Sequence, residues 1–214
     1  MKAENLAGEE WSPAIPARYI AQVKQKLAEG IYRQESVRCF CGADFNDTKI
    51  TDFDRYQMPY RLVMCNECCL MRATPRMSKE AYHQFYNIEY RKIYDGWEFG
   101  AKSEDEDFCF MAQMESGISF KAFTKYFNIN PKTVIDLGCN MGGMLLPFRD
   151  DGAKIYGAEI CNAAINYGRK HDIPIFAGGI RELAEFGIKG DLVVMQDVIE
   201  HLTDLDDLEQ IHRF

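Results

Sequence analysis

The sequence predicts an α/β fold in which a parallel sheet occupies the C-terminal part and a small cysteine-rich module precedes it. From residue 132 onward, four apolar runs of strand length alternate with segments of helical length. Such alternation is typical of parallel strands joined by right-handed crossovers. Before this region, five of the eight cysteines fall within residues 39–69. These two observations define the expected architecture.

Length and composition limit the class of protein. The 214 residues, of which 47% are hydrophobic, suffice for one full domain and a smaller one. No apolar run approaches the ~20 residues that a membrane span needs, and no secretory signal is visible at the N-terminus. We therefore expect a cytoplasmic protein without a membrane partner. In such a compartment, clustered cysteines are more often metal ligands than disulfides.

The charge distribution argues against nucleic acid as a partner. Residues 131–214 contain 8 basic and 14 acidic side chains, so they carry most of the net charge of −8. Binding a phosphate backbone usually requires a basic face. We expect a small-molecule substrate instead.

Four segments are expected along the chain. Residues 1–36 should be helical, with apolar residues on one face of a helix that begins near Ala17 and ends at Gly30. Residues 37–77 form the cysteine module, and residues 78–130 a helical linker or cap. There Ser103 and Glu106 have the spacing of a capping box, which predicts a helix running towards Phe127. Residues 131–214 form the sheet domain.

Within the sheet domain, strands are predicted at 133–137, 154–159, 173–176 and 191–196. Helices are predicted at 142–150, 161–171 and 181–186, and a last one begins near residue 202 or 204. Ligands of such sheets bind at the carboxyl ends of the strands.

A glycine turn follows the first of these strands. Gly138 allows a sharp bend, Asn140 tolerates a positive φ, and Gly142 permits close approach of a ligand. Glu159 ends the next strand, where a carboxylate can accept hydrogen bonds from a ribose. The same pattern fits a dinucleotide fold. However, Asp136 points a negative charge towards the loop, which disfavours a pyrophosphate and favours a sulfonium cofactor.

These segments resemble the class I S-adenosylmethionine-dependent methyltransferases, whose fold is Rossmann-like. The matching stretches are residues 135–142, 156–160 and 191–202. The resemblance implies that the glycine loop holds the methionine end, that Glu159 holds the ribose and that the fourth strand leads to the active site. The implied cofactor-binding residues are Asp136, Gly138, Asn140, Gly142, Glu159, Gln196 and Asp197. The family often has an acid after the third strand, where this chain has residues 177–179, Ala-Gly-Gly, so adenine contacts are not assigned.

The cysteine module predicts a structural zinc site. Cys39, Cys41, Cys65 and Cys68 form two close pairs, which can supply four thiolates to a tetrahedral ion. Cys69 could replace Cys68 as the fourth ligand, and the alternative to a metal site is a set of reduced, buried cysteines. With the stretches 68–77 and 85–90, this region resembles methyltransferases that carry an N-terminal zinc-binding domain. Many of those act on nucleotide sugars, polysaccharide precursors or natural products.

Glu200 and His201 are the candidate catalytic pair. They follow the fourth strand, and a histidine that titrates near neutrality can accept a proton from an acceptor. Alternatively, the pair only caps the next helix. A non-catalytic zinc-ribbon or nucleoside-binding module, and less favourably an RNA methyltransferase, are the competing functions. A complete domain of this family has three further strands, so we expect the sheet to be incomplete at Phe214 and its uncovered edge to favour self-association.

Overall fold

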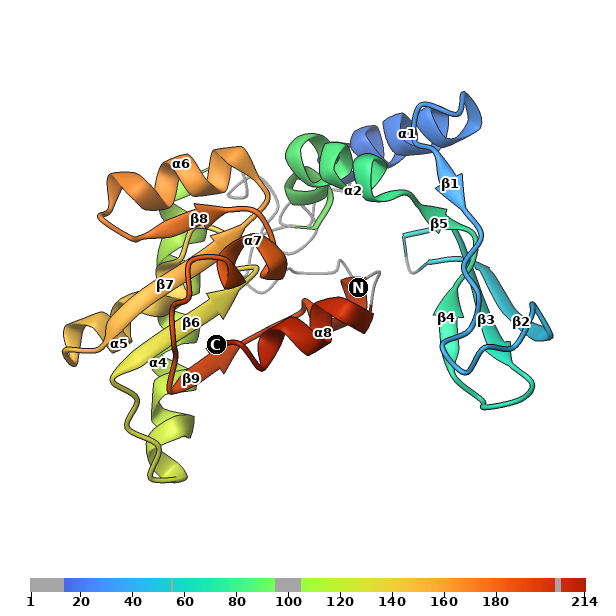
Figure 1. The fold of residues 1–214 in the computed structure, drawn as a ribbon. Helices are drawn as coiled ribbons and strands as arrows, with labels where there is room; N and C mark the ends of the chain where they lie inside the picture. Colours follow the sequence, from blue (N-terminus) through green and yellow to red (C-terminus); the bar gives the residue numbers. More distant parts are fainter. Residues whose placement is uncertain (1–13, 55, 95–104, 203–204) are drawn as a thin grey trace. The chain divides into compact units, whose positions relative to one another are not determined.

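The computed structural model describes residues 14–54, 56–94, 105–202 and 205–214. It divides into two compact units, Met1–Ala101 and Lys102–Phe214 (Figure 1). Within the described ranges, no helix combines the length and the apolar character needed to cross a membrane. This division differs from the expected boundary at residue 130, because the helix α4 (Glu106–Tyr126) packs on helices of the second unit.

The first unit begins with the predicted helix, α1 (Ala14–Ala28), which is followed by Gly30 at φ +71°. Next comes β1 (Gln34–Glu35), which pairs antiparallel with β5 (Arg76–Met77). Between them, β2 (Asp47–Phe53), β3 (Pro59–Cys65) and β4 (Met71–Ala73) form an antiparallel three-stranded sheet. The segment between the two cysteine pairs thus contains β2 and most of β3. Helix α2 (Lys79–Phe85) begins at the N-cap Ser78, whose Oγ accepts from the backbone N–H of Ala81.

A π-helix, η1 (Tyr86–Tyr90), follows α2 directly and was not expected from the sequence. The side chain of Glu89 is fully buried at this element. Its Oε1 lies 2.5 Å from Lys26 Nζ of α1, and its Oε2 accepts a hydrogen bond of 2.5 Å from the hydroxyl of Tyr32. The side chain of Glu89 therefore connects η1 to α1.

Three tyrosines continue the core of the first unit along this helical segment. The ring centroids of Tyr86 and Tyr90 are 4.5 Å apart, and so are those of Tyr90 and Tyr94. Tyr90 and Tyr94 pack against a buried cluster that includes Val23 and Ile93. These rings form a packed stripe.

The second unit contains a parallel four-stranded sheet in the order β8-β7-β6-β9. Strands β6 (Thr133–Leu137) and β7 (Lys154–Glu159) match the prediction residue for residue. Strand β8 (Ile175–Ala177) starts two residues later than predicted, because the N–H of Ile173 is bonded to the carbonyl of Gly168 at the end of the preceding helix. Strand β9 (Leu192–Val194) is shorter than predicted, and Asp197, at φ +53°, already lies in a turn.

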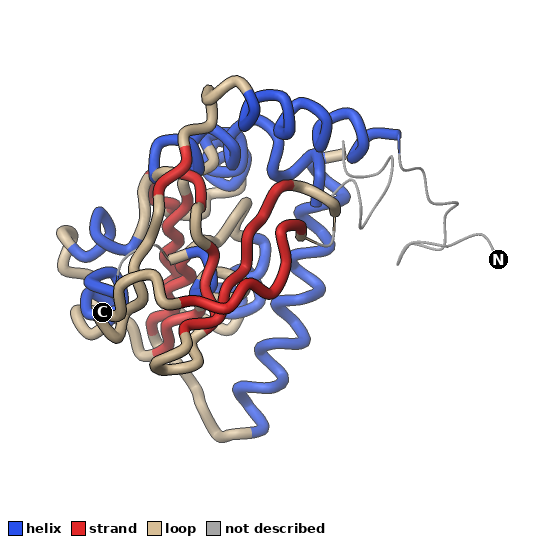
Figure 2. The backbone as a smooth tube through the Cα atoms, turned by 90° about the vertical axis from the view of Figure 1, so that its right-hand side faces the viewer, coloured by secondary structure: helices blue, strands red, loops and turns tan. Residues whose placement is uncertain are grey.

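Helices cover both faces of this sheet (Figure 2). On one face, Ile135 and Leu137 pack against α7 (Ile180–Ala184), to which α8 (Leu205–Ile211) is adjacent. On the other, α6 (Asn162–Lys170) lies so close to Ile175 that a Cβ on Gly168 would be 2.4 Å from its Cδ1. The first crossover contains η3 (Gly143–Leu145) and α5 (Leu146–Asp150).

Helix α4 begins at a different cap from the one predicted. Asp105 is the N-cap, and its carboxylate accepts from the N–H of Phe108, whereas Ser103 lies outside the described residues. Further along α4, Gly117 faces η3: a Cβ there would be 2.4 Å from the carbonyl oxygen of Met144. The helix thus packs directly on the crossover that follows the glycine turn.

Candidate functional site

The glycine turn at the end of β6 has the backbone geometry that the sequence predicted. Gly138, Asn140 and Gly142 all have positive φ, of +76°, +52° and +78°. A Cβ on Gly138 would lie 2.5 Å from Cγ2 of Val198. Only glycine fits this bend without strain. Because Val198 belongs to the segment after β9, the bend and that segment lie side by side at the carboxyl end of the sheet.

Glu159 turns back towards the bend from the end of β7. Its Oε2 accepts a hydrogen bond of 2.8 Å from the N–H of Asn140, and its Oε1 accepts from the N–H groups of Ile160 (2.7 Å) and Cys161 (2.8 Å). An ionised carboxylate offers about four acceptor positions. Three are taken by the backbone, which fixes the side chain and leaves one for a hydroxyl of a ligand. Glu159 is 9% exposed.

Asp136 is buried in β6 on the approach to the bend. It is 3% exposed, and burial together with the charge of Glu159 raises its pKa to about 8. Two carboxyl groups therefore lie near the same loop with different environments. A cationic ligand at this position would favour the ionised form of Asp136.

The loop also contains one polar atom that the described protein leaves unpaired. Asn140 Oδ1 is buried and has no hydrogen-bond partner among the described residues. Buried polar atoms are usually hydrogen-bonded, so this atom can accept from a ligand group. A positive-φ bend, a fixed carboxylate at the second strand end and an unpaired acceptor together fit the nucleoside and amino-acid parts of S-adenosylmethionine.

One contact to the loop was not expected from the sequence. Gln113 of α4 accepts a hydrogen bond of 3.2 Å through its Oε1 from the N–H of Gly143. Nothing in the local pattern indicated this role, because α4 was assigned to a linker.

After the third strand, the N–H of Gly179 is bonded to Oε2 of Glu182 at 2.8 Å, so that the Ala-Gly-Gly stretch leads directly into α7.

The remaining predicted site residues follow β9. Gln196 and Asp197 are exposed in the turn, and His201 is exposed at the end of η4 (Ile199–His201). The backbone of Glu200 is part of η4, but its side chain lies outside the described residues. The segment carrying the predicted acid–base pair is thus adjacent to the glycine bend through Val198.

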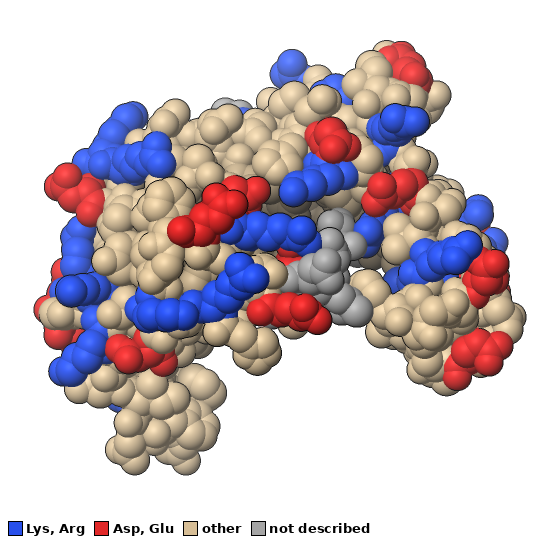
Figure 3. Space-filling view, in the orientation of Figure 1, with Lys and Arg blue, Asp and Glu red and all other residues tan. Residues whose placement is uncertain are grey.

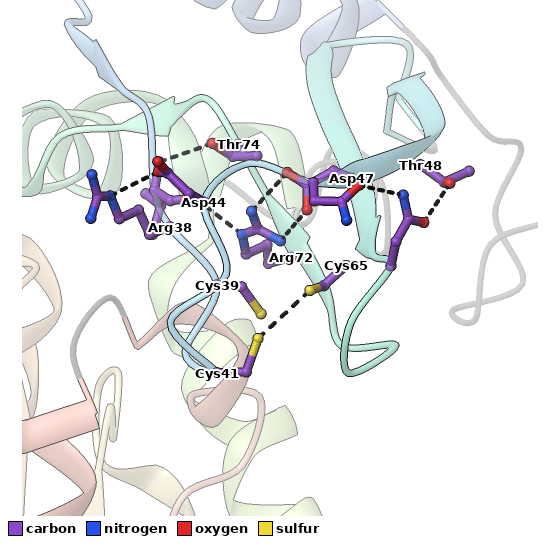
Figure 4. A network of polar contacts seen from close by, with 12 residues as sticks. Arg38, Cys39, Cys41, Asp44, Asp47, Thr48, Cys65, Arg72 and Thr74 are labelled. Atoms are coloured by element: carbon purple, nitrogen blue, oxygen red, sulfur yellow. Dashed lines mark hydrogen bonds and ion pairs between the residues drawn. The ribbon is translucent and has the colours of Figure 1, made fainter.

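The four predicted zinc ligands come together in the first unit, and Figure 4 shows three of them, Cys39, Cys41 and Cys65. The Sγ atoms of Cys39, Cys41, Cys65 and Cys68 all lie within 4.8 Å of one another. Cys39 Sγ is 3.4 Å from Cys68 Sγ, and Cys41 Sγ is 3.7 Å from Cys65 Sγ. Thiolates bound to one zinc ion at about 2.3 Å are about 3.8 Å apart. The cluster therefore fits a tetrahedral ion.

Local geometry selects Cys68 rather than Cys69. Cys69 is not among the four clustered thiols and adopts a φ of +62°, while its N–H closes the turn by bonding to the carbonyl of Cys65 at 2.9 Å. On the other side, the backbone N–H of Cys41 lowers the pKa of the Cys39 thiol to about 7. The pKa values of the Cys41 and Cys68 thiols are raised instead, by their hydrogen bonds to Cys39, so the cluster without a metal favours one thiolate over its neighbours.

The match to a known protein family lies within the second unit. Residues 111–214 match a family model described as "Methyltransferase domain". A ubiquinone biosynthesis O-methyltransferase from Brucella anthropi is 33% identical over 79 residues, which are 34% of this chain and 32% of that protein. The chain thus spans about a third of the length of this curated relative.

Two solved structures are similar at lower identity. The magnesium protoporphyrin IX methyltransferase from Synechocystis PCC 6803, with bound SAM, is 19% identical at a TM-score of 0.45, covering 63% of this chain and 69% of that one. The plantazolicin methyltransferase BpumL, in complex with SAH, is 17% identical at a TM-score of 0.44, covering 60% of this chain and 51% of that one. The family model itself matches 104 of the 214 residues, just under half of the chain.

Proposed function

We propose that this chain acts as an S-adenosylmethionine-dependent methyltransferase on a small-molecule acceptor in the cytoplasm, and that a structural zinc ion stabilises its first unit. For the acceptor we propose a sugar, a nucleotide sugar or a natural-product intermediate. The observation that carries the proposal is the hydrogen bond from the N–H of Asn140 to Glu159. It joins the glycine bend and the second strand end into one ligand-binding wall.

Each residue of this wall has a role that its environment supports. Gly138 and Gly142 let the bend keep its positive-φ shape while Val198 packs against the first and Ile173 against the second. The remaining acceptor position of Glu159 binds a ribose hydroxyl. Asp136 and the free Oδ1 of Asn140 face the positively charged amino-acid end. S-adenosylmethionine, when bound, supplies the electrophilic methyl group; the protein supplies alignment.

Proton removal from the acceptor is assigned to His201. Its exposure allows exchange with solvent, and the contact between Val198 and Gly138 keeps its segment beside the bend. Glu200 is assigned to orient the imidazole. A general base contributes typically ~10²–10⁴ in rate.

Calorimetric titration of the protein with S-adenosylhomocysteine tests the cofactor site. We expect binding by the natural sequence and at least a tenfold loss in Gly138→Ala, because the new Cβ collides with Val198 in a backbone conformation that alanine disfavours. Gly152→Ala is the matched control: Gly152 also has a positive φ, of +89°, but its Cβ would meet no atom within 4 Å. If the natural sequence binds no S-adenosylhomocysteine, the enzyme proposal fails.

The charge pattern supports a small acceptor over RNA. On the face shown in Figure 3, Lys and Arg side chains are interspersed with Asp and Glu. A mobility-shift titration with RNA at physiological salt should therefore show no complex in the micromolar range, and a specific complex would favour the RNA methyltransferase alternative.

A further inference from the structure

The two halves of the cysteine cluster are supported very differently by the fold. Cys65 ends β3, and the turn after it is held to the start of β2 by several bonds, among them the N–H of Asn66 to the carbonyl of Asn46 at 2.9 Å. By contrast, residues 36–46, which carry Cys39 and Cys41, contain no strand or helix. Something other than regular secondary structure must therefore position the first pair of thiols.

Two side chains in or next to β4, those of Arg72 and Thr74, hold the backbone of Val37 in place of strand pairing. The β1–β5 pairing places Glu35 opposite Arg76, and continuing that register by two residues would place Val37 opposite Thr74. A regular ladder cannot pass residue 75, a proline, which has no N–H to donate. Instead, the Oγ1 of Thr74 accepts from the N–H of Val37 at 2.9 Å. The Nε of Arg72 donates to the carbonyl of Val37 at 3.1 Å.

Arg72 is itself fixed at both ends. Its Nη1 and Nη2 donate to the two carboxylate oxygens of Asp47, each at 2.8 Å, and the two side chains are only 7% and 11% exposed. Asp47 begins β2 and lies opposite Cys65 in the β2–β3 register. The guanidinium thus spans from the strand pair that carries Cys65 to the segment that carries Cys39 (Figure 4).

The charge of Arg72 also suits this place. Four thiolates around a divalent ion leave a net charge of −2, so a buried cation close by offsets part of it. The pKa of Arg72 is raised by its hydrogen bonds to Asp47 and further by the charges of Cys39 and Cys65. Residues that hold or neutralise metal ligands from the second layer affect metal affinity substantially.

We infer that Arg72 and Thr74 are positioning residues of the cysteine site, which dock the segment around Val37 so that Cys39 and Cys41 meet Cys65 and Cys68. This inference rests on the proposed zinc site. It assigns metal affinity to two side chains that are not ligands and that lie 31 and 33 positions after Cys41 in the sequence.

The test measures metal binding by the full chain. Zinc affinity is determined by competition with a chromophoric chelator, and Co²⁺ substitution reports tetrahedral thiolate coordination by its visible absorption. We expect Arg72→Met to lower zinc affinity by about 10–100-fold. Arg72→Lys, which keeps the charge but cannot bond both Asp47 and Val37 in the same way, should fall in between. Arg38→Met is the matched control, because Arg38 is next to Cys39 but its side chain is 69% exposed.

Thr74→Val provides an independent variant, since it removes the acceptor for Val37 and leaves every charge in place. It should lower zinc affinity at least threefold and shift the Co²⁺ spectrum, and it decides the matter if Arg72→Met does not fold. If the natural sequence binds neither Zn²⁺ nor Co²⁺, the zinc proposal itself fails. If the natural sequence binds one ion and Arg72→Met and Thr74→Val bind it as tightly as Arg38→Met does, the positioning role is refuted.

Discussion

The carboxyl group of Asp136 is 3% exposed, and its pKa is raised to about 8 by burial and by the charge of Glu159. The ordinary pKa of an aspartate, 3.8, applies to the unfolded chain. Because the pKa is higher in the folded chain, the folded chain binds more protons. The contribution of Asp136 to stability is therefore complete below about pH 4 and is lost as the pH rises towards 8. One such proton corresponds to a slope of about 1.4 kcal/mol per pH unit. Between pH 5 and 7, Asp136 therefore lowers the free energy of unfolding by about this amount for each unit of rising pH. Asp136→Asn should remove this decrease, as measured by urea denaturation.

The control for this prediction is Asp150→Asn, because the side chain of Asp150 is 70% exposed. It should leave the pH dependence unchanged, and equal slopes in Asp136→Asn and the natural sequence would contradict the prediction. Asp136→Asn should also weaken binding of S-adenosylmethionine at pH 8, since it removes the charge that faces a cationic ligand. Asp136 would then be a residue that lowers the stability of the free protein and supports its function.

Glu89 provides a second prediction for a single residue. Because it is fully buried between Lys26 and Tyr32, Glu89→Gln removes one partner of a buried ion pair. Breaking such a pair costs several kcal/mol, and we expect about 2–4 kcal/mol here because Lys26 remains 25% exposed and can be hydrated. Denaturation monitored by circular dichroism measures the loss. Glu29→Gln, in an exposed position at the end of α1, should change stability by less than about 0.5 kcal/mol.

Among the elements, α4 shows how packing can reverse an intrinsic preference. Gly117→Ala would raise helix propensity by about 1 kcal/mol. However, its Cβ would lie 2.4 Å from the backbone oxygen of Met144, so α4 and η3 must move apart. We expect a net destabilisation of about 1–3 kcal/mol, together with weaker S-adenosylhomocysteine binding, because Gln113 would lose its bond to Gly143. Ser119→Ala, on the exposed side of α4, should be neutral or stabilising; a stabilised Gly117→Ala would show that this contact does not limit the fold.

The elements also separate what local patterns encode from what tertiary contacts decide. Strands β6 and β7 were predicted to the residue, because a buried apolar run ends at Gly138 in one case and at Glu159 in the other. The π-helix η1 was not, since its departure from a regular helix accompanies the burial of Glu89 against residues more than 50 positions away. The same reason explains why spacing found the cysteines but not Arg72, which reaches Val37 across 35 positions.

At the scale of the candidate cofactor site, the residue types were predictable and their partners were not. An acid at the end of the second strand was expected to bind a ribose. The structure adds that the N–H groups of Asn140, Ile160 and Cys161 already occupy most of its acceptor positions. Those bonds depend on how the bend and the start of α6 meet, which no periodicity in the sequence describes.

For the whole molecule, the two compact units each have a hydrophobic core of their own. Val23, Tyr32 and Ile93 belong to the core of the first, and Ile135 and Leu183 to that of the second. A metal ion bound by cysteines contributes directly to the folding energy of the unit that holds it. A ligand stabilises the unit that binds it by an amount set by its concentration relative to Kd. The two proposed sites should therefore influence two different unfolding events.

Differential scanning calorimetry of the full chain should resolve these two unfolding events as separate transitions. We expect a chelator of zinc to lower the Tm of one transition or abolish that transition. S-adenosylhomocysteine at one hundred times its Kd should stabilise the other unit by about 2.7 kcal/mol, which raises the Tm of its transition by several degrees. Cys41→Ser should reproduce the effect of the chelator, whereas Cys69→Ser, outside the cluster, should not. Were the chelator and S-adenosylhomocysteine to shift a single common transition, the units would unfold together, and the zinc ion would stabilise the cofactor-binding sheet as well as the cysteine module.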